Sequence, residues 1–219
     1  MLLQLTTLSL EIPTGWRRYR TVDYGLDRLV CLWIAVSPDS RCYVYREYCE
    51  SDLPIGASAK AICKRTPSGE DIYATLAPPD LFSRAQETGR TKATIFAEHG
   101  VAFTKTSNDR ETGWLAIKEL LCDTGGGPRL NIFENCVELI RCLPALTVDK
   151  IRPTDCASEP HEITHAPDAL RGFAIFYAKP APPETKPRYA VWTKDMWEDF
   201  GSASDEEKKY LKQKYGEPK

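Results

Sequence analysis

No run of apolar residues in this 219-residue sequence is long enough to cross a membrane. The first twelve residues have neither the basic start nor the small-residue cleavage site of a secretory signal, so we expect a cytoplasmic protein with no membrane contact. Charge of one sign is not in excess, because 29 basic and 31 acidic residues leave a formal net charge of -2. The chain as a whole does not attract polyanions. Any nucleic-acid contact must depend on local basic clusters, such as Arg17 with Arg18 and Arg20, or Lys105 with Arg110.

Two further signatures are missing. No Lys-Ser or Lys-Thr follows the glycine run Gly125-Gly126-Gly127 at the spacing of a Walker A motif, so we do not expect ATP hydrolysis. The eight cysteines contain no CxxC pair and are scattered through apolar segments. We expect reduced, mostly buried thiols rather than disulfides or zinc ligands. The cysteines are Cys31, Cys42, Cys49, Cys63, Cys122, Cys136, Cys142 and Cys156.

The first third of the chain has the pattern of an antiparallel meander. β-branched and aromatic residues dominate 17–24, 29–36 and 42–49, and turn residues at 37–40 precede the third segment. The chain is long enough for one sizeable core plus a tail.

Short strands and helices alternate in the following part of the chain. Such alternation implies parallel strands with helices on both faces, so we expect an α/β fold with a mixed sheet. The strands are expected at 71–76, 101–104 and 130–133. The helices are expected at 55–64, 91–99, 109–122, 135–143 and from Pro167 to about Ala178.

We expect one domain over residues 1–179, followed by an appendage over 180–219. The stretch Pro180-Ala181-Pro182-Pro183 has the composition of a stiff linker. Beyond it the chain is charged, although Trp192 and Trp197 can anchor a short helix and 205–215 has helical composition.

Four carboxylates and one histidine are candidates for a metal site. Asp23 ends the first strand beside a glycine turn, Asp80 follows the fourth strand, Glu47 lies inside the third, and Asp168 begins the last core helix. Hard divalent cations prefer such oxygen ligands. His165, three residues before Asp168, can orient a water or a leaving group. Each has a structural alternative, because acidic residues are also common in turns and at helix starts.

A competing motif overlaps the last of these segments. His161-Glu162-Ile163-Thr164-His165 matches HExxH, in which two histidines bind zinc and the glutamate activates water for peptide hydrolysis. However, the five residues lie between Pro160 and Pro167, include two β-branched residues and lack a long apolar-faced helix. His99, the only other histidine, is far upstream. We interpret the match as a coincidence and keep a zinc peptidase as the weaker alternative.

Several segments together resemble the nuclease half of the large terminase subunits of tailed phages and prophages, in order and spacing. The resemblance covers about Gly15 to Ala178. Residues 16–25 are similar to the family's first nuclease strand, 43–48 to its third strand and 77–84 to its second acidic segment. Residues 107–114 are similar to its N-D-R-x-x-G-W stretch, 135–144 to its N-x-x-x-L-I-x-x-L-P helix and 165–171 to its H-x-x-D-A-x-R segment.

This resemblance implies a ribonuclease H-like nuclease that cuts concatemeric viral double-stranded DNA during genome packaging. It implies two Mg2+ or Mn2+ ions held by Asp23, Asp168 and a middle ligand, with His165 matching the family's histidine. The family often has an Asp-Pro pair after the fourth strand, whereas this chain has Pro78-Pro79 followed by Asp80. Asp80 or Glu47 is therefore the expected middle ligand.

The resemblance also implies partners and a place of action. These are an ATPase motor domain, a portal protein and a small terminase subunit, in the cytoplasm of a bacterial host. We expect basic residues near Arg17 and Arg110 to hold the DNA backbone. Because the middle carboxylate is displaced and no ATPase motif is present, a catalytically weak DNA- or portal-docking module is the main alternative.

Overall fold

The computed structural model describes residues 11–25, 27–123, 125–178, 189–190 and 192–218. The chain divides into two compact units, Met1–Lys179 and Pro180–Lys219. The proline-rich stretch 180–183, interpreted above as a linker, lies outside the described residues. None of the described helices is long and apolar enough to cross a membrane.

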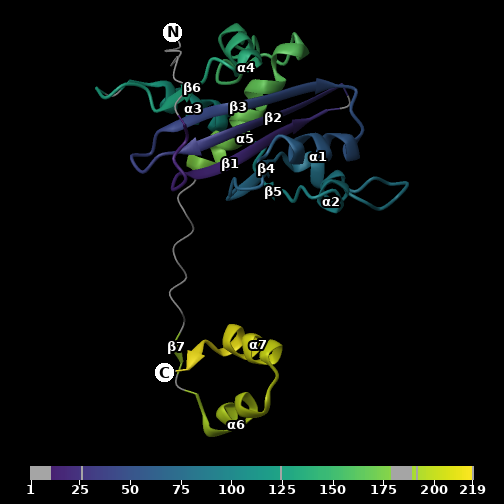
Figure 1. Ribbon diagram of the computed structural model, residues 1–219, viewed down its shortest axis with the longest axis vertical. Coiled ribbons are helices and arrows are strands. Elements are labelled where there is room, and N and C mark those ends of the chain that lie inside the picture. The colour runs from purple at the N-terminus through teal and green to yellow at the C-terminus, as the bar shows by residue number, and fades with distance from the viewer. Residues whose placement is uncertain (1–10, 26, 124, 179–188, 191, 219) are drawn as a thin grey trace. The chain divides into compact units, whose positions relative to one another are not determined.

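The larger unit is built on a mixed sheet with the strand order β5-β4-β1-β2-β3-β6 (Figure 1). The predicted meander is confirmed, because β1 (Arg17–Tyr24), β2 (Arg28–Val36) and β3 (Cys42–Ser51) pair antiparallel in sequence order. Both faces of β2 are apolar: Leu32 faces one core cluster and Trp33 the other. A strand buried on both sides belongs at the centre of a sheet.

The later strands are parallel to their neighbours, as predicted. They are β4 (Ala74–Ala77) beside β1, β5 (Thr104–Lys105) beside β4 and β6 (Leu130–Ile132) beside β3. Two of them start later than expected. The chain leaves the turn that Glu70 closes onto Pro67 and first bonds to β1 where the N–H of Tyr73 donates to the carbonyl of Arg18, so β4 begins only at Ala74. Gly100, with a φ of +89°, ends the preceding helix and lets the N–H of Val101 bond to Phe96, which delays β5.

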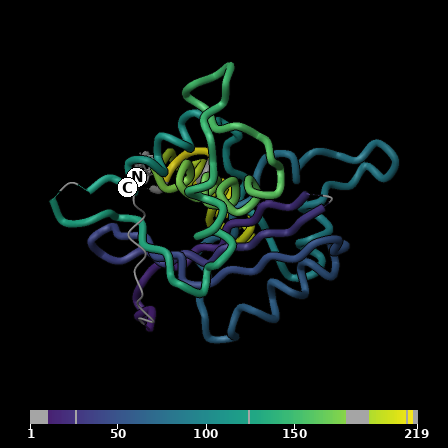
Figure 2. Tube along the Cα trace, turned by 90° about the horizontal axis from the view of Figure 1, so that it is seen from above, coloured from purple at the N-terminus to yellow at the C-terminus, as the bar shows by residue number. Residues whose placement is uncertain are grey.

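Helices cover both faces of the sheet, which confirms the predicted α/β class. One core cluster joins the sheet to α3 (Arg110–Leu121), α4 (Val137–Cys142) and α5 (His165–Ala178). The other joins it to α1 (Ile55–Lys64) and α2 (Lys92–Glu98). Figure 2 shows the two layers on opposite sides of the purple strands. Short 3-10 turns are η1 (Pro79–Phe82), η2 (Leu143–Ala145) and η3 (His161–Ile163).

The smaller unit has its own aromatic core. Its elements are β7 (Tyr189–Ala190), α6 (Lys194–Ser202), α7 (Asp205–Tyr215) and β8 (Glu217–Pro218). Trp192 is buried, donates from Nε1 to the carbonyl of Gly216 at 3.0 Å, and contacts Trp197 and Phe200. Ser204 and Glu207 form a capping box that starts α7.

All eight cysteines are unpaired in the structure. Four are buried and two are half-buried, but Cys63 and Cys122 are exposed. Burial raises the pKa of Cys42 to about 12. Such thiols behave as small apolar side chains of the core.

Candidate active site

Two predicted carboxylates share one edge of the sheet. Asp23 is the penultimate residue of β1, and Asp80 lies in η1, directly after β4. The two strands run parallel, with Thr21 opposite Leu76. Their carboxyl ends therefore meet at the same edge, a usual place for functional residues in open α/β sheets.

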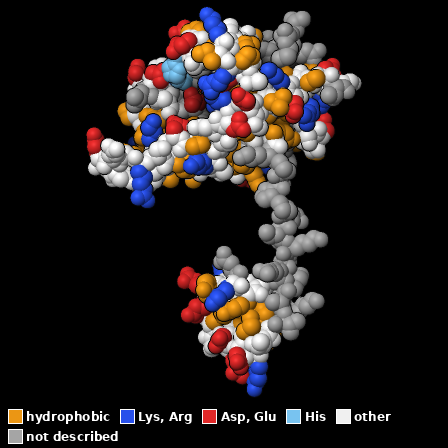
Figure 3. Space-filling view, turned by 180° about the vertical axis from the view of Figure 1, so that it is seen from behind, with side chains coloured by type: hydrophobic (Ala, Val, Ile, Leu, Met, Phe, Trp, Pro, Cys, Tyr) orange, Lys and Arg blue, Asp and Glu red, His pale blue; other side chains and the backbone are white. Residues whose placement is uncertain are grey.

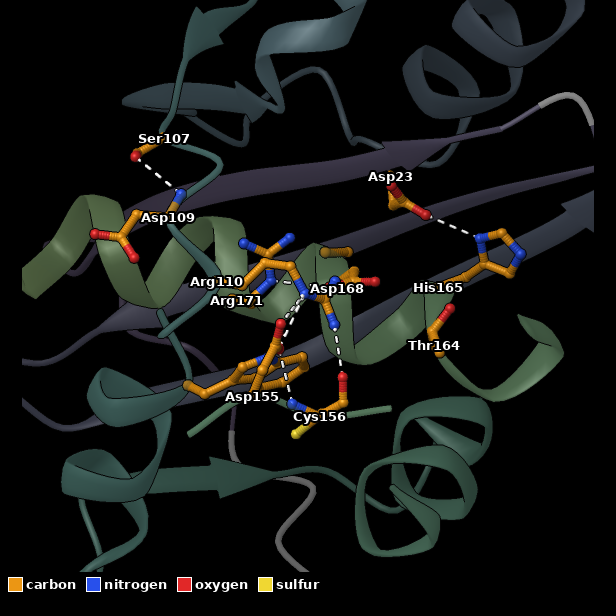
Figure 4. A network of polar contacts seen from close by, with 12 residues as sticks. Asp23, Ser107, Asp109, Arg110, Asp155, Cys156, Thr164, His165, Asp168 and Arg171 are labelled. Carbon is orange, nitrogen blue, oxygen red and sulfur yellow. Dashed lines mark hydrogen bonds and ion pairs between the residues drawn. The ribbon is translucent and has the colours of Figure 1, made fainter. Parts of the chain in front are cut away.

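Helix α5 adds the third carboxylate and the histidine. The hydroxyl of Thr21 donates to the carbonyl of Ala169 at 2.7 Å, which ties the first turns of α5 to β1. His165 and Asp168 are three residues apart and so project from one side of the helix. Figure 4 shows His165 next to Asp23, and Asp168 next to Arg110 and Arg171.

Asp23 is the residue on which the other candidate residues, His165, Asp168 and Asp80, all act. Its side chain is 25% exposed, and its Oδ2 lies 2.9 Å from Nδ1 of His165. Burial raises the pKa of Asp23, the hydrogen bond with His165 opposes that rise, and the charges of Asp168 and Asp80 add to it. The bond to Asp23 raises the pKa of His165 against the effect of its burial. The carboxylates of Asp80 and Asp168 thus both lie close enough to Asp23 to act on its charge.

This donor set fits a hard divalent cation. Carboxylate oxygens are the preferred ligands of Mg2+ and Mn2+. A cation offsets both the burial and the repulsion from Asp168 and Asp80 that raise the pKa of Asp23. Asp80 is exposed, and Asp168 keeps 18% of its side chain exposed, so both are accessible to an ion.

Two arginines hold Asp168 in place. Nε of Arg171 lies 2.8 Å from its Oδ1, and Nη1 of Arg110 lies 3.3 Å from the same oxygen. Gly113 makes room for this arrangement, since a Cβ there would lie 2.5 Å from Cγ of Arg171. The arginine and glycine of the predicted N-D-R-x-x-G-W stretch therefore support the last carboxylate rather than the core alone.

Asp155 holds Arg110 in this position, although no sequence motif marks it as a functional residue. It is buried, accepts from Nε of Arg110 at 3.0 Å and from Nε1 of Trp114 at 3.0 Å (Figure 4). Burial works to raise the pKa of Asp155, but the hydrogen bond from Arg110 and its other donors outweigh it and lower the pKa. Only a contact between segments 45 residues apart reveals this role.

Glu47, the other candidate for the middle ligand, is engaged elsewhere. Its two oxygens accept the N–H groups of Glu138 at 2.9 Å and Leu139 at 2.7 Å, so it caps α4. Glu47 lies on β3, which is separated from β1 by β2. It pairs with Leu32 of β2, and Leu32 pairs with Thr21 of β1. At the usual strand spacing that is about 10 Å across the sheet from β1. We leave Glu47 out of the proposed metal site.

The HExxH segment does not form one continuous helix. Residues His161–Ile163 are a 3-10 turn, and α5 begins at His165. Glu162, the glutamate that would activate water, is exposed. The geometry is not that of a zinc peptidase helix, although the two histidine rings do approach each other, with centroids 4.4 Å apart.

The basic residues near Arg17 do not flank the carboxylates, contrary to expectation. Arg17 begins β1, at the end opposite Asp23. Arg18 is buried and donates to the carbonyl groups of Ile12 and Pro13, and Arg20 donates to Thr75.

Of the other two basic residues, Arg110 is committed to Asp155 and Asp168. Lys105 is exposed and ends β5 level with Ala77 of β4, on the edge that carries Asp80. It is the predicted cation best placed for a phosphate.

Among solved structures, the fold is similar to nuclease domains of phage large terminases. The nuclease domain of the P22 large terminase matches 80% of this chain and 91% of its own length, with a TM-score of 0.62 and 15% sequence identity. The large terminase nuclease domain of bacteriophage SPP1, solved with bound Mn, matches 74% of this chain and 85% of its own, with a TM-score of 0.48 and 17% identity. No protein-family model and no curated protein matches the sequence. The P22 likeness confirms the ribonuclease H-like fold.

Proposed function

We propose that this chain is a metal-dependent endonuclease that cuts concatemeric double-stranded DNA during the packaging of a phage genome. The observation that carries the proposal is the hydrogen bond between Asp23 and His165 at a sheet edge where the charges of Asp168 and Asp80 also act on Asp23. The fold likeness to a terminase nuclease domain supports the same reading. Fold alone does not imply activity, so the proposal depends on the site.

Asp23, Asp80 and Asp168 would hold two Mg2+ or Mn2+ ions. Bound there, the metal supplies an activated water and charge stabilisation for phosphodiester hydrolysis. His165 keeps the Asp23 carboxylate oriented through the contact at Nδ1. Arg110 and Arg171 fix the rotamer of Asp168, and Lys105 meets the DNA backbone without reading its bases.

Such an enzyme would act in the cytoplasm of an infected bacterium. It would work beside an ATPase motor, a portal protein and a small terminase subunit, because cutting has to be coupled to the filling of a capsid. These partners follow from the proposed role in packaging and need their own binding assays.

The test is cleavage of supercoiled plasmid with Mg2+, Mn2+, Zn2+ or EDTA. We expect nicking and linearisation with Mn2+ or Mg2+ and none with EDTA. Asp23→Asn and Asp168→Asn each remove charge that the transition state needs, so we expect the rate to fall by about 100-fold or more. Asp71→Asn is the matched control, because Asp71 is exposed and has no part in the group.

The outcomes separate this proposal from the docking module. A stable, folded protein that binds DNA but cuts with no metal would overturn the nuclease and favour docking. Cleavage that survives in both Asp23→Asn and Asp168→Asn would place the activity elsewhere or in a contaminant.

A further inference from the structure

Three potential metal ligands meet just outside the carboxylate group described above. They are Asp27, in the turn between β1 and β2, His161 in η3 and His165 at the start of α5. One ligand atom from each lies within 4.8 Å of the other two. Nε2 of His165 is 3.1 Å from Oδ2 of Asp27, and Nε2 of His161 is 3.7 Å from the same oxygen. Segments more than 130 positions apart in sequence are thereby brought together.

We propose that Asp27, His161 and His165 form a separate binding site for a borderline divalent cation, with Zn2+ as the best match. Two imidazole nitrogens and one carboxylate oxygen are a donor set that suits Zn2+ and is too rich in nitrogen for Mg2+. The site goes beyond the proposed nuclease function, which uses the carboxylates of Asp23, Asp80 and Asp168, and it shares only His165 with it.

The spacing of the donor atoms fits one ion. Bonds of about 2.0–2.2 Å in tetrahedral geometry place neighbouring donor atoms about 3.3–3.6 Å apart. The two distances to Oδ2 of Asp27, 3.1 and 3.7 Å, lie on either side of that range. The third separation, between the two histidines, is at most 4.8 Å, so side-chain rotations that shorten it bring all three donors to one centre.

His165 is already oriented for such a role. Its Nδ1 contacts Asp23, which leaves Nε2 directed at Asp27. A carboxylate behind one ring nitrogen fixes the tautomer and orientation of a histidine that binds metal through the other. The side chain of His165 is only 4% exposed, so the ring has little freedom to turn away.

The other two ligands give the site access to solvent. Asp27 and His161 expose 56% and 61% of their side chains. Figure 3 shows histidine at the surface of the larger unit, next to acidic side chains. An ion can reach this position without passing the carboxylate group, and the open side leaves room for a water as a fourth ligand.

Binding would join the turn after β1 to the start of α5. Both segments also carry the proposed catalytic residues, Asp23 on β1 and Asp168 on α5. Zn2+ at Nε2 leaves the Nδ1–H of His165 for Asp23, so the two sites can be filled together. We expect the cation to stabilise this end of the fold and raise the midpoint of thermal unfolding.

The experiment is calorimetric titration of EDTA-treated, dialysed protein with Zn2+ in the presence of excess Mg2+, which saturates the oxygen ligands. We expect one Zn2+ per chain. His161→Ala and Asp27→Asn should each weaken its affinity at least about tenfold, because each removes a direct ligand. His99→Gln and Glu162→Gln are matched controls, since His99 is outside the cluster and Glu162 adjoins His161 without belonging to it.

Titration with Co2+ adds a spectroscopic signature, because nitrogen ligands change the visible absorption of the ion. Equal Zn2+ affinity in the wild type and His161→Ala, with both proteins folded by circular dichroism, would overturn the site. The two proposals can be tested separately. Asp168→Asn should lose DNA cleavage but bind Zn2+ as the wild type does. His161→Ala should lose Zn2+ binding but still cut DNA with Mg2+.

Discussion

At the scale of single residues, the candidate site depends on the arginines and other polar side chains that hold its carboxylates in place. Arg110 is the main example, because it contacts both Asp155 and Asp168. Its planar guanidinium provides several donors in a fixed geometry, which the single ammonium of lysine does not. The position of Asp168 is thus set by shape as well as by charge.

Arg110→Lys should therefore impair cleavage while keeping the charge. We expect the rate with saturating Mn2+ to fall about tenfold or more, as for other residues that orient a metal ligand, and the Mn2+ concentration needed for half-maximal rate to rise. Arg90→Lys is the control, since Arg90 is exposed and pairs with Glu98 away from the site. A rate loss without any change in Mn2+ dependence would count against a positioning role.

Acid should weaken the fold through Asp155. Its pKa is lowered in the folded protein, with the bond from Arg110 overcoming the opposing effect of burial. Its stabilising effect is complete above the unfolded pKa of about 3.9 and is lost as the pH falls through the lower folded value. Asp155→Asn should therefore lose more stability relative to the wild type at pH 6 than at pH 3, by urea unfolding followed through tryptophan fluorescence. A difference independent of pH would contradict this linkage.

At the scale of elements, the long, regular segments were predictable and the contacts between them were not. β-branched and aromatic composition bounded by turn residues predicts β1 to β3, and the 3.6-residue period predicts α3 and α5. The short strands β4 and β5 were misplaced by several residues because turns and helix ends decide where they begin. Asp23, Asp80, Asp168 and His165 were singled out by position at strand ends and helix starts. Asp27 and Asp155 carry no such local signal.

The packing of α3 against α5 makes a prediction at Gly113. Gly113→Ala puts a methyl group 2.5 Å from Cγ of Arg171, so the two helices or the arginine must move. We expect the free energy of unfolding to fall by about 1–3 kcal/mol, as for other overpacked contacts. Gly69→Ala meets nothing within 4 Å and should leave it nearly unchanged. Chemical denaturation measures both, and equal stability of the two variants would argue against close packing at Gly113.

At the scale of the whole molecule, the chain consists of two units with separate cores. The larger is held by apolar clusters on both faces of its sheet, and the smaller by Trp192, Trp197 and Phe200. All the proposed catalytic residues lie in the larger unit. The charge balance of the chain also matters here, because a net charge of -2 leaves the proposed DNA binding to a few local cations such as Lys105.

The separate cores imply separate effects of mutation. Trp192→Ala removes a large buried ring and its bond to Gly216, so we expect the smaller unit to unfold at a lower temperature. The larger unit should keep its own unfolding transition and its rate of plasmid cleavage within about twofold, because no group near Asp23 changes. Leu170→Ala is the complementary variant, since Leu170 is fully buried under the sheet and its loss should destabilise the larger unit alone. Differential scanning calorimetry on the full chain separates the two transitions. If Trp192→Ala lowered both transitions together, the units would be energetically coupled, and the smaller one would have to be treated as part of the enzyme.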